Sequence, residues 1–480
     1  MRLYTFNFKK MLKAIVLSVL YAAILYSILL SVFKRTWRPK ENLYYFYQLE
    51  NNSLDVINIG SSHVHSSINT IQLYQDYGIA SYNLSAGSQP VWYSWYYLRE
   101  AMKTQNPKVI VLDVYTLINP NDDDFIEKAQ LNLLTMKPSL NKLEALCTSG
   151  TDQVIRLFLG FPKNHIRYRE LNAEAYDDKV CLNLMGYAYS SEVEPLDTAE
   201  IVDVGAVTGT LPITEKSELY LRKILELCHE KDIGIVLVNA PWPHISVEDA
   251  KKYNYIGEIA KEYGVDFLNG CTLEEELGID YTTDNGGDYG HLNYTGSQKW
   301  TSCLGAYLSG NYDLPDRRKE PGTVWEESAR ALENRMTGEY LQEVDYPSEY
   351  LEYLLNHQEY AFALIFDTPV PTDTVRYMNT LEAGLGEAEN GYLVRMPDGN
   401  LFTGRNFSSD TKLYTDMYHK ISGYHGKDEE CKFLFMQFNS QVAEARKSGG
   451  IFFIVFDPFR TSPLDMIEFE EGKGYKRVIE

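Results

Sequence analysis

The sequence predicts an α/β protein with a doubly wound, mostly parallel sheet. An N-terminal transmembrane helix precedes the sheet, and a smaller α+β or mostly β domain follows it. Three observations lead to this fold class. Short buried strands alternate with helices between residues 54 and 310. An apolar run without charge lies near the N-terminus, and the pattern changes after a segment rich in Pro and charge at 312–322.

The apolar run covers residues 14–33, "AIVLSVLYAAILYSILLSVF". It is long enough to cross a hydrocarbon core of about 30 Å. A secretory signal peptide would have an apolar core of about 7–15 residues followed by a small-residue cleavage site. Here the basic segment "KRTWRPK" follows instead, which favours an uncleaved anchor. Lys and Arg flank the run equally, so the positive-inside rule leaves the orientation open.

Charge and cysteine content exclude several kinds of partner. The formal net charge is −22, although the first 40 residues contain no Asp or Glu. The rest of the chain is therefore strongly acidic, which argues against nucleic acid as a partner. The six cysteines form no C-x-x-C pair and no zinc spacing, so we expect free thiols, no metal site and no cofactor.

Five strands and five helices are expected in the α/β part. The predicted strands are 54–60, 79–85, 108–115, 233–243 and 265–269. The predicted helices are 69–78, 91–105, 217–232, 249–264 and 293–310. Right-handed crossovers between them give an open doubly wound sheet.

Residues 116–213 interrupt this alternation and indicate an insertion, which could act as a lid. His165 and Arg167 in it are either members of ion pairs within the insertion or groups that grip an anionic glycan or acyl group.

The expected domain organisation has five parts. They are a basic tail (1–13), an anchor (14–33), an α/β domain (34–312), a linker with a helix (313–344) and an accessory domain (345–480). In the accessory domain, "PDG" within "GYLVRMPDGNLF" (391–402) predicts a hairpin turn.

The segment "NIGSSHVHSS" (58–67) directly follows the first predicted strand. Ligands of open α/β sheets bind outside the carboxyl ends of the strands. Gly60 permits a tight turn there, and a serine after it would reach solvent near the start of a helix. Ser62 is thus a candidate nucleophile, with a simple helix-capping serine as the alternative. Ser61 is a weaker candidate.

A serine nucleophile needs a base. The segment "DYGH" places Asp288 three residues before His291, just before the closing helix. This spacing lets the carboxylate reach Nδ1 of the imidazole and leaves Nε2 free to take the serine proton. Asp284 is a rival acid, seven residues from His291.

These segments resemble the SGNH (GDSL-type) hydrolase superfamily, whose fold is flavodoxin-like. The resemblance covers about residues 54–310 and includes the turn "YNLSAGSQP". The anchor, the insertion and "HLNYTGSQKW" are similar to the membrane-anchored branch of polysaccharide O-acetyltransferases and D-alanyl-transfer proteins of teichoic acid synthesis. The resemblance implies a triad of Ser62, Asp288 and His291.

The family's oxyanion hole uses three donors. The resemblance assigns two of them to the backbone of Ser62 and of Ser85 or Gly87. The third is an asparagine, which is missing here because the third strand ends in "LDVYTL". Tyr115 and Asn239 are candidates to replace it.

The remaining candidate substrate contacts are His63, Gln89 and Asn239, besides His165 and Arg167 of the insertion.

The resemblance implies a serine acyltransferase or esterase that acts on O-acyl groups of an extracytoplasmic polysaccharide. The partners of such an enzyme would be a cell-surface glycan or acyl donor and a membrane-bound O-acyltransferase. The enzyme would lie in the cell membrane, with its body outside the cytoplasm. The alternative is a catalytically degenerate glycan-binding or scaffold protein. The segments "YLLNHQEYAFALIFD" and "SGGIFFIVFDP", within residues 345–480, resemble interleukin-like inducer domains, which implies a glycan-binding module.

Overall fold

A computed structural model of the chain forms two compact units, Met1–Ala331 and Leu332–Glu480. The division between them falls within helix α14 (Val324–Glu343). The described residues are 8–33, 42–118, 125–159, 180–196, 202–287, 290–366, 370–405, 411–416, 419–427, 432–439, 441–443, 450–458 and 463–470.

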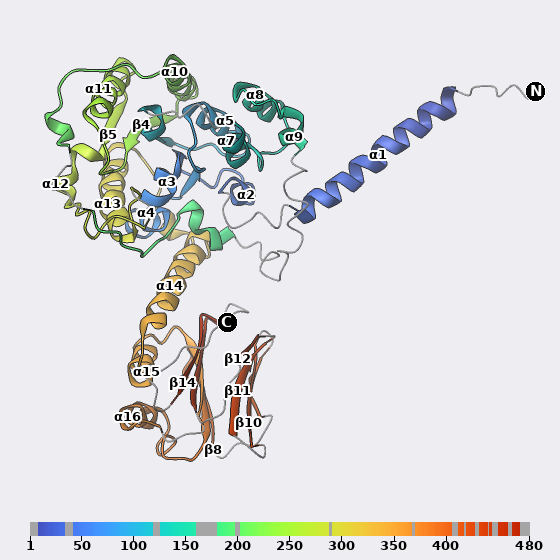
Figure 1. Cartoon of the computed structure of the whole chain (residues 1–480), viewed down its shortest axis with the longest axis vertical. Coiled ribbons are helices and arrows are strands. Elements are labelled where there is room, and N and C mark those ends of the chain that lie inside the picture. Colours follow the sequence, from blue (N-terminus) through green and yellow to red (C-terminus); the bar gives the residue numbers. More distant parts are fainter. Residues whose placement is uncertain are drawn as a thin grey trace, which may run out of the picture. The chain divides into compact units, whose positions relative to one another are not determined.

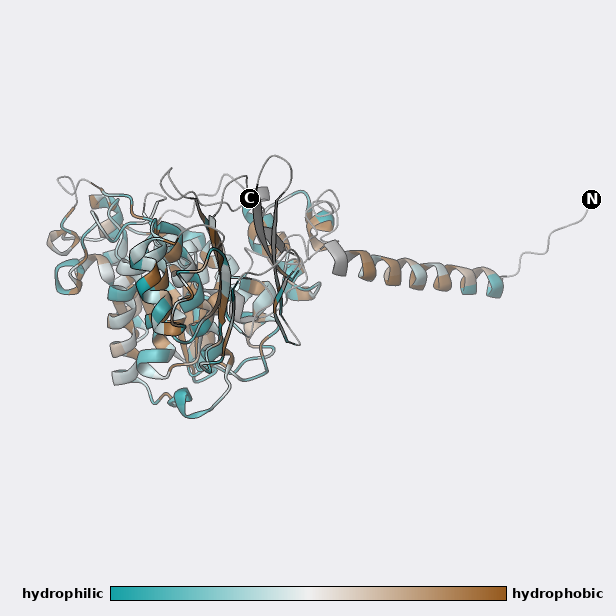
Figure 2. Ribbon diagram, turned by 90° about the horizontal axis from the view of Figure 1, so that it is seen from below, coloured by the Kyte–Doolittle hydropathy of each residue, from teal (hydrophilic) through white to brown (hydrophobic). Residues whose placement is uncertain are grey.

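Helix α1 (Phe8–Phe33) contains the predicted anchor. Its segment Lys9–Leu29 is long and apolar enough to cross a membrane, and none of it is buried in the protein. Figure 2 shows this helix as mostly hydrophobic, with a hydrophilic turn near its amino end. The predicted apolar helix is therefore confirmed.

The first unit contains a parallel sheet of five strands in the order β2-β1-β3-β4-β5. Their bounds are Val56–Gly60 (β1), Ser81–Ser85 (β2), Val109–Asp113 (β3), Gly234–Asn239 (β4) and Asp266–Asn269 (β5). Every residue of β1, β2 and β3 is buried, because helices cover both faces of the sheet. The five predicted strands and the parallel α/β sheet are confirmed.

The helices divide between the two faces of the sheet (Figure 1). Helices α3 (Ser62–Ser67), α4 (Thr70–Tyr77) and α13 (Tyr294–Asn311) share one core with β1, β3 and β4. Right-handed crossovers place α5 (Val91–Ala101), α10 (Glu215–Glu230) and α11 (Val247–Glu262) on the other face. Short helices complete the unit: α2 (Asn42–Phe46), η7 (Gly270–Thr272), α12 (Glu274–Leu277) and η8 (Arg317–Lys319).

The predicted insertion is helical where it is described. It contains α6 (Tyr115–Ile118), α7 (Phe125–Leu133), α8 (Leu140–Thr148), α9 (Val154–Leu159), η4 (Val180–Gly186) and η6 (Val204–Ala206). Hydrogen bonds join α8 to α5: Asn141 donates to the carbonyl of Tyr96, and the Tyr96 hydroxyl lies 2.7 Å from that of Thr148.

The first unit continues beyond residue 312, where the sequence suggested its end. The Arg317 guanidinium donates to both carboxylate oxygens of Asp55, which is buried just before β1. The Trp325 indole donates to the carbonyl of Ser81 in β2 and stacks on Tyr74. These contacts make residues up to Ala331 part of the α/β unit.

The second unit contains two antiparallel sheets, in the orders β14-β13-β6-β7-β8 and β12-β11-β10-β9. The first comprises β6 (Ala361–Phe366), β7 (Gly391–Arg395), β8 (Leu401–Arg405), β13 (Gly450–Phe456) and β14 (Asp465–Glu470). The second comprises β9 (Thr411–Thr415), β10 (Lys420–Lys427), β11 (Lys432–Phe438) and β12 (Gln441–Ala443). The predicted hairpin at "PDG" joins β7 and β8.

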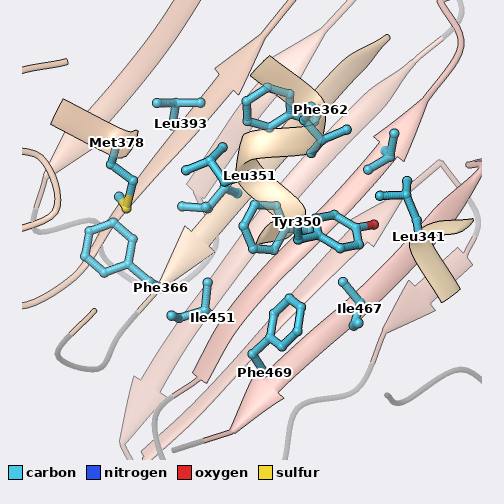
Figure 3. Packing of buried hydrophobic residues seen from close by; sticks show 14 of the residues in the cluster. Leu341, Tyr350, Leu351, Phe362, Phe366, Met378, Leu393, Ile451, Ile467 and Phe469 are labelled. Atoms are coloured by element: carbon cyan, nitrogen blue, oxygen red, sulfur yellow. The ribbon is translucent and has the colours of Figure 1, made fainter. Parts of the chain in front are cut away.

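Two apolar cores hold the second unit together. One lies between the larger sheet and the helices α15 (Pro347–Asn356) and α16 (Thr372–Leu381), where Tyr350, Phe366 and Phe469 pack together (Figure 3). The other core contains residues of both sheets, including Ile421, Phe438 and Phe456. The unit is thus a helix layer on two packed sheets, in agreement with the predicted α+β or mostly β domain.

Candidate active site

The turn after β1 presents Ser62 at the carboxyl edge of the parallel sheet. Ser61 caps α3, and its Oγ accepts a hydrogen bond from the His63 amide (3.3 Å). Ser62 is the first residue of α3 and is only partly buried, whereas Ser61 is fully buried. The strand order reverses between β1 and β3, so this turn lies at the switch point where such sheets bind ligands.

His291 reaches the same point from the loop before α13. Its Nε2 lies 2.8 Å from Oγ of Ser62, within hydrogen-bond distance. The backbone holds this loop, because the Gly286 amide donates to the His291 carbonyl (2.7 Å) and the Asn293 amide donates to the Asp284 carbonyl (3.0 Å). The structure thus brings together a hydroxyl and an imidazole that are 229 positions apart in the chain.

Gly290 lets the His291 loop approach its neighbour closely. Its φ of +147° is one that residues with a side chain rarely adopt. A Cβ atom at this position would lie 2.4 Å from Nε1 of Trp242, which is closer than such atoms can come. A glycine is therefore required beside His291.

Of the two candidate acids, Asp288 and Asp284, only Asp284 lies within the described residues. Asp284 is fully buried, and its carboxylate accepts hydrogen bonds from the Lys299 ammonium (2.6 Å) and the Asp280 amide (2.8 Å). These partners give Asp284 a structural role in the loop that precedes His291.

Asp113, at the end of β3, is a residue of the site that the sequence analysis missed. Its Oδ2 accepts hydrogen bonds from the Ser61 hydroxyl (2.9 Å) and the Ser61 amide (3.2 Å), and its Oδ1 accepts one from the Tyr115 amide (3.1 Å). Burial raises its pKa to about 6, although these hydrogen bonds oppose the shift. The sequence signal was an acid directly after a run of buried aliphatic residues.

A group of aromatic rings lies beside Ser62 and His291. The ring of His63 stacks on Tyr115 with centroids 3.6 Å apart, and the Trp242 ring meets Tyr115 edge-on at 5.1 Å. The His63 ring also lies 5.0 Å from that of His291. Burial lowers the pKa of His63, and burial raises the pKa of Tyr115 to about 12. Both side chains are therefore neutral near pH 7.

The predicted backbone donors lie at the neighbouring strand end. Ser85 is the last residue of β2 and pairs with Gly60 of β1, so the two turns begin side by side. The Ser85 hydroxyl accepts a hydrogen bond from Asn42 (3.3 Å) and lies 3.1 Å from Nδ1 of His65. A Cβ at Gly87 would meet nothing within 4 Å, so its turn is open.

Two predicted contacts require correction, because both side chains are fully buried. Asn239 was a candidate oxyanion donor, but its amide hydrogen bonds with Tyr253, Asn269 and Cys271 inside the fold. Gln89 was a candidate substrate contact, but its side-chain amide donates to Ser94 of α5. Neither side chain is accessible to a substrate in this arrangement.

His165 and Arg167 lie outside the described residues. Within the described ranges, no group of three or more His, Cys, Asp or Glu side chains could hold a metal ion.

A comparison of the chain with models of protein families gives no match, and a comparison with curated proteins gives none either. The parallel sheet and the geometry at its carboxyl edge therefore stand as the basis for a functional proposal.

Proposed function

We propose that the first unit is a serine-dependent acyltransferase or esterase of the SGNH type, with Ser62 as nucleophile and His291 as general base. The observation that carries this proposal is the 2.8 Å distance between Ser62 Oγ and His291 Nε2 at the switch point of the sheet. The burial of Ser61 and the hydrogen bond from its hydroxyl to Asp113 support Ser62 over Ser61 as the nucleophile.

In the first step, Ser62 Oγ attacks the carbonyl carbon of an O-acyl ester while its proton moves to Nε2 of His291. The tetrahedral intermediate collapses, the bond from carbon to the leaving oxygen breaks, and His291 returns the proton to that oxygen. An acyl-enzyme on Ser62 remains. Water as acceptor then gives an esterase, and a sugar hydroxyl gives a transferase.

The oxyanion of the intermediate needs nearby donors. Ser62 is the first residue of α3, so its amide is one of those that have no partner within the helix. The amides of Ser85 and Gly87, in the adjacent turn, are the proposed further donors. The role of Asp288 as the acid that orients His291 is carried over from the family resemblance.

The substrate class rests on the resemblance and on α1. A transmembrane anchor before the first unit, with the body outside the cytoplasm, suits a cell-surface polysaccharide as acceptor or donor of the acyl group. A membrane-bound O-acyltransferase is the proposed partner in the transfer reaction.

A second function is a degenerate glycan-binding or scaffold protein. One observation favours it: Asn239 is committed to the fold, so it does not replace the missing asparagine of the oxyanion hole. The loss of one such donor typically costs about 10²–10³ in rate.

Turnover of a generic acetyl ester distinguishes the two functions. We expect wild-type activity above a boiled control, its loss in Ser62→Ala, and its retention in Ser61→Ala apart from a modest decrease. Turnover that survives in Ser62→Ala would refute the assigned nucleophile. A wild-type chain without turnover would favour the scaffold function.

A further inference from the structure

We propose that Asp113 is a positioning residue: as a carboxylate it fixes Ser61, and thereby holds the first turn of α3 so that the Ser62 hydroxyl stays in line with His291. This inference rests on the proposed function, because it assigns Asp113 a role in the reactivity of Ser62.

The sheet brings Asp113 under the nucleophile turn. Strand β3 pairs with β1, and Ile59 stands opposite Leu112, so Asp113 comes level with Gly60. A Cβ at Gly60 would lie 2.4 Å from Cβ and 2.8 Å from Oδ2 of Asp113. Only the absence of a side chain at Gly60 therefore admits the carboxylate to this place.

The hydrogen bonds form a chain from Asp113 to α3. The Ser61 hydroxyl donates its single proton to Oδ2 of Asp113, which leaves its lone pairs to accept from the His63 amide. In the chain, Ser62 lies between Ser61 and His63, and hydrogen bonds hold both of these residues. A second bond, from the Ser61 amide to the same carboxylate oxygen, fixes the backbone directly before Ser62.

The charge of Asp113 matters because an ionised carboxylate only accepts hydrogen bonds. It accepts three here, from the Ser61 hydroxyl and from the amides of Ser61 and Tyr115. A protonated carboxyl group or a carboxamide carries a hydrogen-bond donor of its own. That donor would face at least one of these three N–H or O–H groups, so one hydrogen bond would be lost and the turn would be held less firmly. The titratable side chains that interact electrostatically with the carboxylate are His291, Tyr115 and Tyr253, and the ring of His63 stacks on Tyr115.

The test is the rate at which a fluorophosphonate probe labels Ser62 as a function of pH, in the full chain. At about pH 8, Asp113→Asn should reduce the rate about ten- to a hundredfold, the range expected for losing a hydrogen bond to a charged group. Burial raises the Asp113 pKa to about 6, so wild-type Asp113 also becomes neutral below that pH. The ratio of the wild-type rate to the variant rate should therefore approach one near about pH 5.

Two further variants keep this test decisive. Ser61→Ala removes the hydroxyl but keeps the backbone bond, and it should reduce the rate less, again only above about pH 6. Asp55→Asn changes another buried acid, which precedes β1 at the opposite edge of the sheet, and its rate ratio should stay near one at every pH. If Asp113→Asn fails to fold, Ser61→Ala alone decides.

Two results would overturn the positioning role while leaving Ser62 as nucleophile. One is a ratio of the wild-type to the Asp113→Asn labelling rate near one at about pH 8, and the other is a reduction of the labelling rate that does not change with pH. Absence of labelling in the wild-type chain would instead refute the proposed function on which this role rests. The two failures are thus distinguishable in the same experiment.

Discussion

The chain contains two histidines that follow an aspartate by three positions, and the surroundings of the two imidazole rings differ. His291, in the first unit, is partly exposed and its Nε2 lies 2.8 Å from the Ser62 hydroxyl. His419, in the second unit, is buried between the rings of Phe438 and Phe456, and its Nδ1 lies 3.0 Å from the Asp416 carboxylate. The same D-x-x-H spacing thus occurs once beside a hydroxyl at a sheet edge and once inside an aromatic core.

The D-x-x-H spacing therefore does not by itself make a histidine a general base. Reactivity requires in addition a hydroxyl at hydrogen-bond distance and access for a substrate. The turn after β1 brings the Ser62 hydroxyl to His291, and both side chains are partly exposed. The second histidine packs within a hydrophobic core, where its role is to satisfy the Asp416 carboxylate and fill space.

The largest predicted difference concerns turnover. His291→Ala should reduce ester turnover by about 10³–10⁶-fold, because it removes the base and triad members act as a unit. His419→Ala should leave turnover of the folded protein within about twofold, since it lies in the other unit. Steady-state kinetics on an acetyl ester checks both. Comparable losses in the two variants would contradict the distinction.

A smaller effect is expected from the two aspartates. Asp288→Asn should cost about a hundredfold less than His291→Ala, because nucleophile and base remain and only orientation and charge support are lost. Asp416→Asn, the matched change in the second unit, should not alter turnover. Equal kcat values for Asp288→Asn and the wild-type chain would remove Asp288 from the proposed triad.

Much of the fold could be predicted from the sequence. The five runs predicted as strands before residue 270 each form a strand of the parallel sheet, and the predicted hairpin at 391–402 forms β7 and β8. These predictions succeed because strands buried on both faces leave short continuous apolar runs, and amphipathic helices leave an apolar pattern with a period of about 3.6 residues. The turn that contains Ser62 and the D-x-x-H segment could also be identified from short stretches of the sequence.

The rest depends on partners that are distant in the chain. Asp113 meets Ser61 because β3 lies beside β1, and a linear sequence does not state the strand order. Asn239 looked like a free polar group at a strand end, but Tyr253 of α11 and Asn269 of β5 surround it. The end of the first unit was likewise hidden, since Arg317 finds its partner 262 positions earlier.

A shortened chain tests whether the reactive site belongs to the first unit alone. A fragment of residues 42–331 should unfold cooperatively and react with a fluorophosphonate at the rate of the full chain. A fragment of residues 42–312 should be less stable by at least about 3 kcal/mol, because it leaves Asp55 buried without Arg317 and exposes the surface under Trp325. Urea denaturation measures the difference. Equal stability of the two fragments would contradict this unit boundary.

The smallest effect should come from the buried histidine of the second unit. His419→Ala should lower the free energy of unfolding of that unit by about 2 kcal/mol, because it leaves a space between Phe438 and Phe456 and removes a partner of Asp416. His291→Ala should lower the free energy of unfolding less, since the side chain is partly exposed. A larger loss of stability in His291→Ala than in His419→Ala would contradict the structural role assigned to His419.

The site of covalent labelling tests the central claim most directly. The wild-type chain is treated with a fluorophosphonate, digested, and the modified peptide is sequenced by mass spectrometry. We predict a single adduct on Ser62, formed slowly or not at all in His291→Ala and at the wild-type rate in His419→Ala. An adduct on Ser61, or an adduct on Ser62 whose rate does not depend on His291, would contradict the account.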